Sequence, residues 1–257
     1  MDNAVIGESL RYVGVDGFDI GRNDSENVKK NEIKPWQVKS WCIPEVDYEY
    51  ICRMEDVLDL YEEPFDEKRP VVCFDETPVQ LIDDVLAPIA AAPGRVKRQD
   101  YEYERNGTSN LFVFVQPLGG WREVKVTDQR TKKDFAKCMK DLVDEYFPEA
   151  EKIRVVMDNL NTHRLANLYE TFEPEEARRI IKKLEVHHTP KHASWLNMAE
   201  IEISVLGGQC LKRRIGKKEV LEKEVAAYVL DRNSRRAKIL WGFTIPDARV
   251  KMKRLYP

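Results

Sequence analysis

The chain lacks the features of membrane and disulfide-stabilised secreted proteins. Its five cysteines are scattered and form no CxxC pair, and an odd number without metal-ligand spacing is typical of reduced thiols. No apolar run is long enough to span a membrane, and no signal-peptide pattern opens the sequence. We therefore expect a soluble, cytoplasmic protein without membrane contacts.

The chain also lacks the net positive charge of a simple nucleic-acid-coating protein, since it has 42 Lys and Arg against 45 Asp and Glu. The charge is uneven, however, because residues 201–257 hold 14 Lys and Arg and only 6 Asp and Glu. A basic C-terminal segment beside an acidic body predicts local binding of a polyanion. With no internal repeat, the 257 residues are enough for one large domain with a full core.

Hydrophobic patterning predicts a mixed α/β domain. Short apolar runs predict strands at 71–75, 111–115, 121–126, 153–158 and 186–188. Helical periodicity predicts helices at 48–62, 132–147, 173–184, 195–215 and 218–237. A mixed sheet flanked by helices is an α/β layered architecture. The pattern of residues 77–106 predicts a long, irregular and basic excursion, and loops of this length usually have a function.

Three acidic residues are the main candidates for function. Asp75 and Asp158 each end a predicted buried strand, and Glu200 opens a predicted helix. Converging carboxylates repel one another unless a cation neutralises them, and such sets bind the divalent ions used for in-line phosphoryl transfer. Each also has a structural interpretation, since Asp often starts a turn and a buried Glu can be a hydrogen-bonded core residue. Glu202 lies about 200° around the helix from Glu200 and is expected at the rim.

Further polar residues flank these carboxylates. His163 is expected either to contact phosphate or orient a ligand, or to be an ordinary capping or surface histidine. The amides of Asn159 and Asn197 are expected to support the carboxylates. The basic residues are expected either to contact a DNA backbone or to be a solvated charged surface. The candidates for DNA contact are Arg95, Lys97, Arg98, His163, Lys191, His192, Lys212, Arg213 and Arg214.

Three stretches carry a family resemblance. They are residues 71–77, 155–163 and 188–200, of which the last is the most specific, with Thr-Pro followed by Ser-x-Leu-Asn and then Glu200. They resemble bacterial insertion-sequence transposases of the mariner superfamily over roughly residues 28–257. The resemblance implies an RNase H-like, mixed five-stranded sheet flanked by helices. It also implies a catalytic triad of Asp75, Asp158 and Glu200 that binds two Mg²⁺ or Mn²⁺ ions.

The same resemblance implies a reaction and partners. The reaction is DNA strand cleavage at element ends followed by strand transfer, and the partner is double-stranded DNA in a bacterial cytoplasm, at the nucleoid. The motif Trp41-Cys42-Ile43-Pro44 resembles the mariner linker, and 77–106 lies where the clamp loop of that family lies. Both imply a homodimer bridged across two DNA ends.

The resemblance also divides the chain. Residues 1–27 are expected to be a poorly structured or non-family segment, 28–69 a linker with one helix, and 70–257 the catalytic domain. The helix-turn-helix region of relatives is not recognisable before the linker, so we expect an N-terminally truncated transposase. The alternative is a catalytically silent remnant that binds DNA or dimerises with an intact copy. A nuclease without transfer activity has the same triad, whereas a glycosidase does not explain the basic C-terminal segment.

Overall fold

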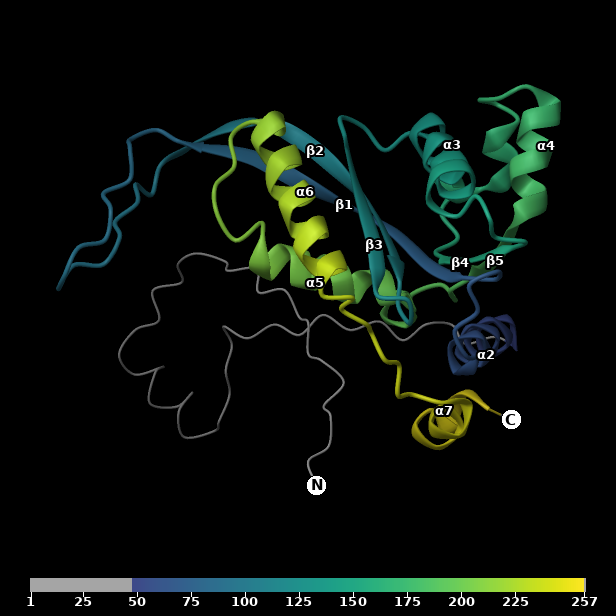
Figure 1. Cartoon of the computed structure of the whole chain (residues 1–257). Coiled ribbons are helices and arrows are strands. Elements are labelled where there is room, and N and C mark those ends of the chain that lie inside the picture. Colours follow the sequence, from purple (N-terminus) through teal and green to yellow (C-terminus); the bar gives the residue numbers. More distant parts are fainter. Residues whose placement is uncertain (1–47, 257) are drawn as a thin grey trace, which may run out of the picture. The chain divides into compact units, whose positions relative to one another are not determined.

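The structure is a computed structural model that describes residues 48–256 (Figure 1). The chain divides into two compact units, Met1–Pro44 and Glu45–Pro257, and all described residues belong to the second. The expected 1–27 segment, residues 28–47 of the expected linker and the motif Trp41-Cys42-Ile43-Pro44 therefore lie outside the described residues. No helix between residues 48 and 256 combines the length and the apolar character needed to cross a membrane.

One five-stranded sheet organises the second unit. Its strands are β1 (Val71–Asp84), β2 (Tyr103–Gln116), β3 (Trp121–Thr127), β4 (Ile153–Met157) and β5 (Leu184–His188), in the order β3-β2-β1-β4-β5. β1 and β3 run antiparallel to β2, while β4 runs parallel to β1 and β5. The predicted mixed five-stranded α/β sheet is confirmed.

Helices cover both faces of this sheet (Figure 1). They are α2 (Tyr48–Glu62), α3 (Lys132–Asp141), α4 (Pro174–Lys183), α5 (Met198–Gln209), α6 (Lys218–Ser234) and α7 (Ile245–Lys251), and α3 continues as a π-helix over Leu142–Tyr146. The N-cap of α3 is Thr131, whose side chain accepts from the Asp134 amide in a capping box. Pro174 fills the first turn of α4, where its missing N–H costs nothing.

Alternation along β1 divides the core between the two faces. Val72 and Phe74 belong to the hydrophobic cluster beneath α3 and α4. Cys73 points the other way, into a cluster with Val156 of β4 and Met54 of α2. Because helices cover both faces of the sheet, the buried strands are continuous apolar runs rather than alternating apolar and polar residues. The helix α2, expected in a linker, thus contributes fully buried residues to the core of the sheet.

Both ends of the expected excursion at 77–106 are strand, because residues 77–84 belong to β1 and residues 103–106 to β2, so the prediction of an irregular segment holds only for the part between them. β1 continues to Asp84 and β2 begins at Tyr103, and the two remain antiparallel partners throughout. Only residues 85–102 lie outside these strands, with isolated bridges between Ile89 and Arg98 and between Ala92 and Arg95. The ribbon projects away from the helices (Figure 1). Its exposed strands have no apolar run, because cross-strand hydrogen bonds rather than burial hold them.

The helix that carries Glu200 is shorter than predicted. It spans Met198–Gln209, whereas the pattern predicted 195–215. A separate 3-10 turn occupies Ser194–Leu196, and the buried side chain of Asn197 caps the helix. The helix ends soon after Gly207 and Gly208, which lower helix stability relative to alanine.

Glu202 lies in the core, so the prediction that it reaches the rim is wrong. Its side chain is fully buried, and its Oε1 lies 3.0 Å from Nε of the equally buried Arg122 on β3. From α6, the Tyr228 hydroxyl donates to Glu202 Oε1 at 2.6 Å, and the Arg232 guanidinium donates to Oε2 at 2.9 Å. Burial raises the pKa of Glu202, but the bonds from Arg232 and Tyr228 bring it below its usual value. Arg122, Tyr228 and Arg232 are distant from Glu202 in the sequence, so the periodicity of the helix alone cannot reveal these contacts.

Replacing Glu202 by alanine leaves Arg122 charged and buried without its carboxylate. We expect a loss of about 3–5 kcal/mol in the free energy of unfolding, measured by urea denaturation. The matched control is Glu224→Ala, because Glu224 pairs with the half-exposed Arg213 and such surface pairs contribute less than about 1 kcal/mol. Equal small losses in both variants would contradict the structural role of Glu202.

Candidate active site

Asp75 and Asp158 lie side by side at one edge of the sheet. β1 and β4 are parallel, with Cys73 opposite Val156. Each aspartate lies two residues beyond this pair, and a spacing of two returns a side chain to the same face of a strand. Asp75 is therefore directed to the face that carries Cys73 and Val156, against which the start of α5 packs, whereas Asp158 lies just beyond the last residue of β4.

Asn197 fixes the start of α5 against β1. Its side-chain oxygen accepts from the Ala199 amide at 3.1 Å and so caps the helix. Its side-chain nitrogen donates to the Phe74 carbonyl at 2.8 Å and approaches Asp75 Oδ2 at 3.4 Å. Asn197 is 1% exposed, so both contacts are shielded from water. The first turn of α5, which contains Glu200, is thereby held beside Asp75.

Burial and neighbouring carboxylates change the acidity of Asp75. Burial first, and then the negative charges of Glu200, Glu76 and Asp158, together raise its pKa to about 7. The hydrogen bond from the Glu76 amide to Asp75 Oδ1, at 2.8 Å, only partly offsets it. A buried carboxyl with a raised pKa among like charges is typical of a functional site.

The donor chemistry of this site fits a hard divalent cation. All three carboxylates supply oxygen ligands, which Mg²⁺ and Mn²⁺ prefer, and a cation would relieve the repulsion that raises the pKa of Asp75. Between residues 48 and 256, no three His, Cys, Asp or Glu side chains already form a metal-binding group. The fit therefore rests on the ligand type and on the negative charges that raise the pKa of Asp75.

His163 is buried between two carboxylates. Its Nδ1 lies 2.5 Å from Asp158 Oδ1 and its Nε2 lies 2.8 Å from Glu76 Oε2. The second contact is an ion pair rather than an aligned hydrogen bond. Burial lowers the pKa of His163, but the interactions with Asp158 and Glu76 outweigh it and raise the pKa to about 9. With the rings of Phe74 and Phe135 packed around it, the imidazolium orients Asp158.

The prediction that His163 contacts DNA is wrong, because the residue is only 1% exposed. The sequence reasoning also missed Glu76, whose side chain is 4% exposed. Glu76 follows Asp75 directly, so strand alternation directs it to the opposite face of β1. The only sign of Glu76's role in the sequence is its position next to Asp75, because its partner His163 comes from a turn after β4.

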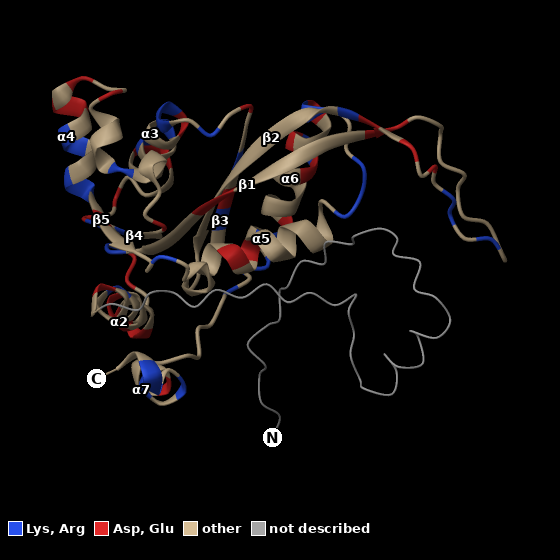
Figure 2. Ribbon diagram, turned by 180° about the vertical axis from the view of Figure 1, so that it is seen from behind, with Lys and Arg blue, Asp and Glu red and all other residues tan. Residues whose placement is uncertain are grey.

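The other candidates for DNA contact lie in three separate segments. Arg95, Lys97 and Arg98 are exposed in the 85–102 loop, and Figure 2 shows basic residues at the end of the ribbon. Lys191 and His192 are exposed just before α5, while Lys212 and Arg213 are exposed just after it. Asn159 is exposed at the end of β4. Arg214, which was also predicted to contact DNA, differs from these residues because its guanidinium donates to Asp84, Glu102 and Asp100 of the ribbon and its loop.

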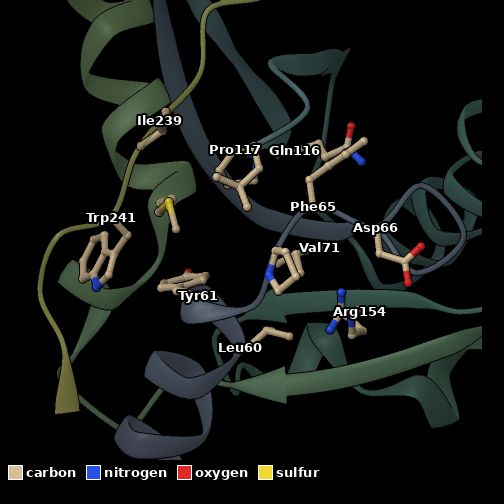
Figure 3. A pocket seen from close by; sticks show the side chains of 13 residues that line it. Leu60, Tyr61, Phe65, Asp66, Val71, Gln116, Pro117, Arg154, Ile239 and Trp241 are labelled. Carbon is tan, nitrogen blue, oxygen red and sulfur yellow. The ribbon is translucent and has the colours of Figure 1, made fainter.

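A small cavity of about 30 Å³ lies elsewhere, near the start of β1 (Figure 3). Val71, Tyr61 and Trp241 are among its mostly apolar lining residues, and none of the three predicted carboxylates lines it. Phosphoryl transfer requires oxygen ligands and charge rather than an apolar cavity. We therefore place the candidate active site at Asp75, Asp158 and Glu200.

Carboxylates at the ends of two adjacent parallel strands, with a third near the start of a helix that packs beside them, are the arrangement expected of a metal-dependent nuclease. The family model described as DDE superfamily endonuclease matches residues 70–222. The chain belongs to this family. No curated protein matches the sequence.

Solved structures of Mos1 transposase have a similar fold. The Mos1 paired-end complex with the left transposon end is 14% identical over 82% of this chain, with a TM-score of 0.51. The Mos1 mariner paired end complex with Mn is 16% identical over 85% of this chain, also with a TM-score of 0.51. The chain spans about 64% of the length of the first of these relatives. The sheet matches the RNase H-like fold of Mos1, which confirms the predicted fold class.

The raised pKa of Asp75 makes the stability of the metal-free protein depend on pH. The folded value of about 7 lies above the ordinary 3.8, so stability is lost as pH rises from about 4 to about 7. Asp75→Asn removes this loss, and at pH 8 with chelator we expect it to be more stable than wild type by up to about 4 kcal/mol. Denaturant unfolding measures the difference, with the exposed Asp59→Asn as control. Parallel pH profiles for Asp75→Asn and wild type would refute this reading.

The His163–Glu76 pair can be measured in a double-mutant cycle of His163→Gln and Glu76→Gln. Each single change leaves a buried partner without its opposite charge, so we expect a coupling energy of about 1–3 kcal/mol in the free energy of unfolding. The control cycle uses His187→Gln and Asp56→Asn, a pair at 2.8 Å whose aspartate is 51% exposed, with coupling below about 1 kcal/mol. If both cycles gave the same small coupling, His163 would not be held as described.

Proposed function

We propose that this chain is the catalytic part of a DNA transposase of the insertion-sequence type. It would cleave DNA strands at element ends and transfer them into a target by in-line phosphoryl transfer. The observation that carries the proposal is the placement of Asp75 and Asp158 at the ends of two paired parallel strands, with the start of the Glu200 helix bonded to β1 through Asn197. Membership of the DDE superfamily endonucleases supports a nuclease chemistry, and the fold neighbour Mos1 is described in a strand transfer complex.

Asp75, Asp158 and Glu200 are the residues that would hold two Mg²⁺ or Mn²⁺ ions, and one Mos1 relative is described with Mn. When bound, such ions activate an oxygen nucleophile and stabilise the leaving oxygen. The surrounding residues prepare the ligands. Asn197 holds the Asp75 strand against the Glu200 helix, and His163 holds one oxygen of Asp158.

The proposed substrate is double-stranded DNA. The exposed basic residues of the 85–102 loop and of the segments flanking α5 are suited to phosphate contacts, which position a duplex without reading its sequence. The residues concerned are Arg95, Lys97, Arg98, Lys191, His192, Lys212 and Arg213. Since such contacts release counterions, binding should weaken steeply with salt.

We infer a second copy of the chain as the protein partner. The 85–102 loop exposes several large apolar side chains, and contiguous exposed apolar surface is typical of an interaction site. They are Val85, Leu86, Ile89, Val96 and Tyr101. The loop also carries three basic and two acidic residues.

The alternative of a silent remnant gains no support from residues 48–256, because all three carboxylates are retained and coupled. A nuclease without transfer activity has the same site. A joining assay separates these two functions, since only a transposase links a cleaved 3′ end to a second DNA.

The triad is tested by cleavage of supercoiled plasmid DNA in Mg²⁺ or Mn²⁺. We expect Asp75→Asn, Asp158→Asn and Glu200→Gln each to reduce cleavage at least about 100-fold, because each removes a ligand and even supporting residues of metal sites contribute 10–100-fold. Asp59→Asn, which changes an exposed carboxylate on α2, should cleave like wild type. Full activity of Glu200→Gln would exclude the proposed triad. A folded wild type that never cleaves would favour the silent remnant.

A further inference from the structure

Tyr61, in the last turn of α2, contacts both segments that carry the carboxylates Asp75 and Glu200. Its hydroxyl donates to the Leu196 carbonyl at 2.8 Å and lies 3.3 Å from Cys73 Sγ. Cys73 precedes Asp75 by two residues on β1. Leu196 precedes Glu200 by four residues and ends the 3-10 turn before α5. One side chain from α2 therefore connects the central strand with the turn that leads into the Glu200 helix.

The hydroxyl proton of Tyr61 determines the direction of these bonds. Burial raises the pKa of Tyr61 well above its usual value, so the hydroxyl keeps its proton at neutral pH. A carbonyl oxygen can only accept, so this proton is directed to Leu196, and the tyrosine oxygen remains as an acceptor for the Cys73 thiol. The three groups form a chain of hydrogen bonds from β1 to the turn, and the bonds of such a chain strengthen one another.

Aromatic rings connect Tyr61 to the same turn a second time. The ring of Trp241, in the segment between α6 and α7, lies 5.3 Å from the Tyr61 ring and 6.3 Å from the ring of Trp195, on which it stacks. Trp195 is the middle residue of the 3-10 turn. Trp241 is itself fixed, because its Nε1 donates to the Phe243 carbonyl at 2.8 Å. α2 and the C-terminal segment therefore both pack on the turn.

The small cavity near the start of β1 borders this cluster (Figure 3). Tyr61 and Trp241 line it together with Met198, the first residue of α5. Side chains that line a void lack packing partners on that side. Packing alone therefore leaves the Tyr61 ring incompletely held, and the bonds of its hydroxyl supply the remaining constraint.

We propose that Tyr61 is a positioning residue for Glu200 and acts through the turn that leads into α5. The DDE family model matches residues 70–222, so Tyr61 precedes the matched region and Trp241 follows it. The helix α2, expected in a linker, thereby serves the candidate active site. The inference rests on the proposed function for its metal, whereas the contacts of Tyr61 are independent of it. Loss of the hydroxyl releases the turn, lets Glu200 move relative to Asp75 and weakens the binding of a divalent cation.

The test compares Tyr61→Phe with Tyr256→Phe in the full chain. Tyr61→Phe keeps the aromatic ring and removes only the hydroxyl. Tyr256→Phe is the matched control, because the Tyr256 hydroxyl also bonds to α2, at 2.9 Å from Glu55 Oε1, instead of to the turn before α5. Thermal unfolding checks that both variants fold.

For Tyr61→Phe we expect about tenfold weaker Mn²⁺ binding by electron paramagnetic resonance, since supporting residues of metal sites contribute about 10–100-fold. In the metal-free protein, we expect the amides of residues 198–201 to exchange hydrogen at least about fivefold faster, because the start of α5 opens more readily. Both quantities keep their wild-type values in Tyr256→Phe. Should Tyr61→Phe fail to fold, Cys73→Ala removes the other partner of the hydroxyl and shifts both quantities in the same direction.

Three results overturn the proposal. Unchanged Mn²⁺ affinity in Tyr61→Phe, with or without faster exchange, means that the hydroxyl does not position a metal ligand. Equal losses of affinity in Tyr256→Phe mean that any loosening of α2 has this effect and that the turn has no special role. A wild type that binds no Mn²⁺ overturns the proposed function together with this inference, whereas the first two results overturn the inference alone.

Discussion

The hydrogen bond from the Asn197 side chain to the Phe74 carbonyl joins the helix that carries Glu200 to the central strand. It is 2.8 Å long, and Asn197 is 1% exposed, so water does not compete for it. Its loss would leave a buried polar group without a hydrogen-bond partner. The same side chain caps α5. One residue therefore sets both where the helix begins and which strand it begins beside, and the separation of Glu200 from Asp75 follows from these two constraints.

Strand alternation then separates two kinds of acidic residue on β1. Asp75 is directed to the face of α5, where Glu200 and Asp158 add negative charge and raise its pKa. Glu76 is directed to the opposite face, where the His163 cation compensates it. The imidazolium thus lies between Glu76 and Asp158, while burial and the neighbouring carboxylates still raise the pKa of Asp75. That remaining negative charge is what makes the Asp75 side of the strand suited to divalent cations.

Local patterns in the sequence predicted much of this arrangement. The apolar runs before Asp75 and Asp158 identified two neighbouring strands, and α2 occupies the residues that its periodicity indicated. Long-range pairings could not be predicted from local patterns, because the partners come from elements that are distant in the sequence. The β1–β2 ribbon, the burial of Glu202 against Arg122 and the capture of His163 between Asp158 and Glu76 all belong to this class. Arg213 and Arg214 give the clearest case, since no property of a basic run distinguishes an exposed arginine from one that braces a loop.

The most direct measurement of the central claim is the binding of Mn²⁺ to the folded chain, followed by electron paramagnetic resonance. If Asp75, Asp158 and Glu200 form one site, free Mn²⁺ disappears from the spectrum in a saturable manner with wild type. Asp75→Asn and Glu200→Gln, which each remove one carboxylate, then weaken Mn²⁺ binding by about an order of magnitude or more. Asp59→Asn binds Mn²⁺ normally. Equal Mn²⁺ binding by wild type, Asp75→Asn and Glu200→Gln would contradict the account, because the carboxylates would then not act together on a metal.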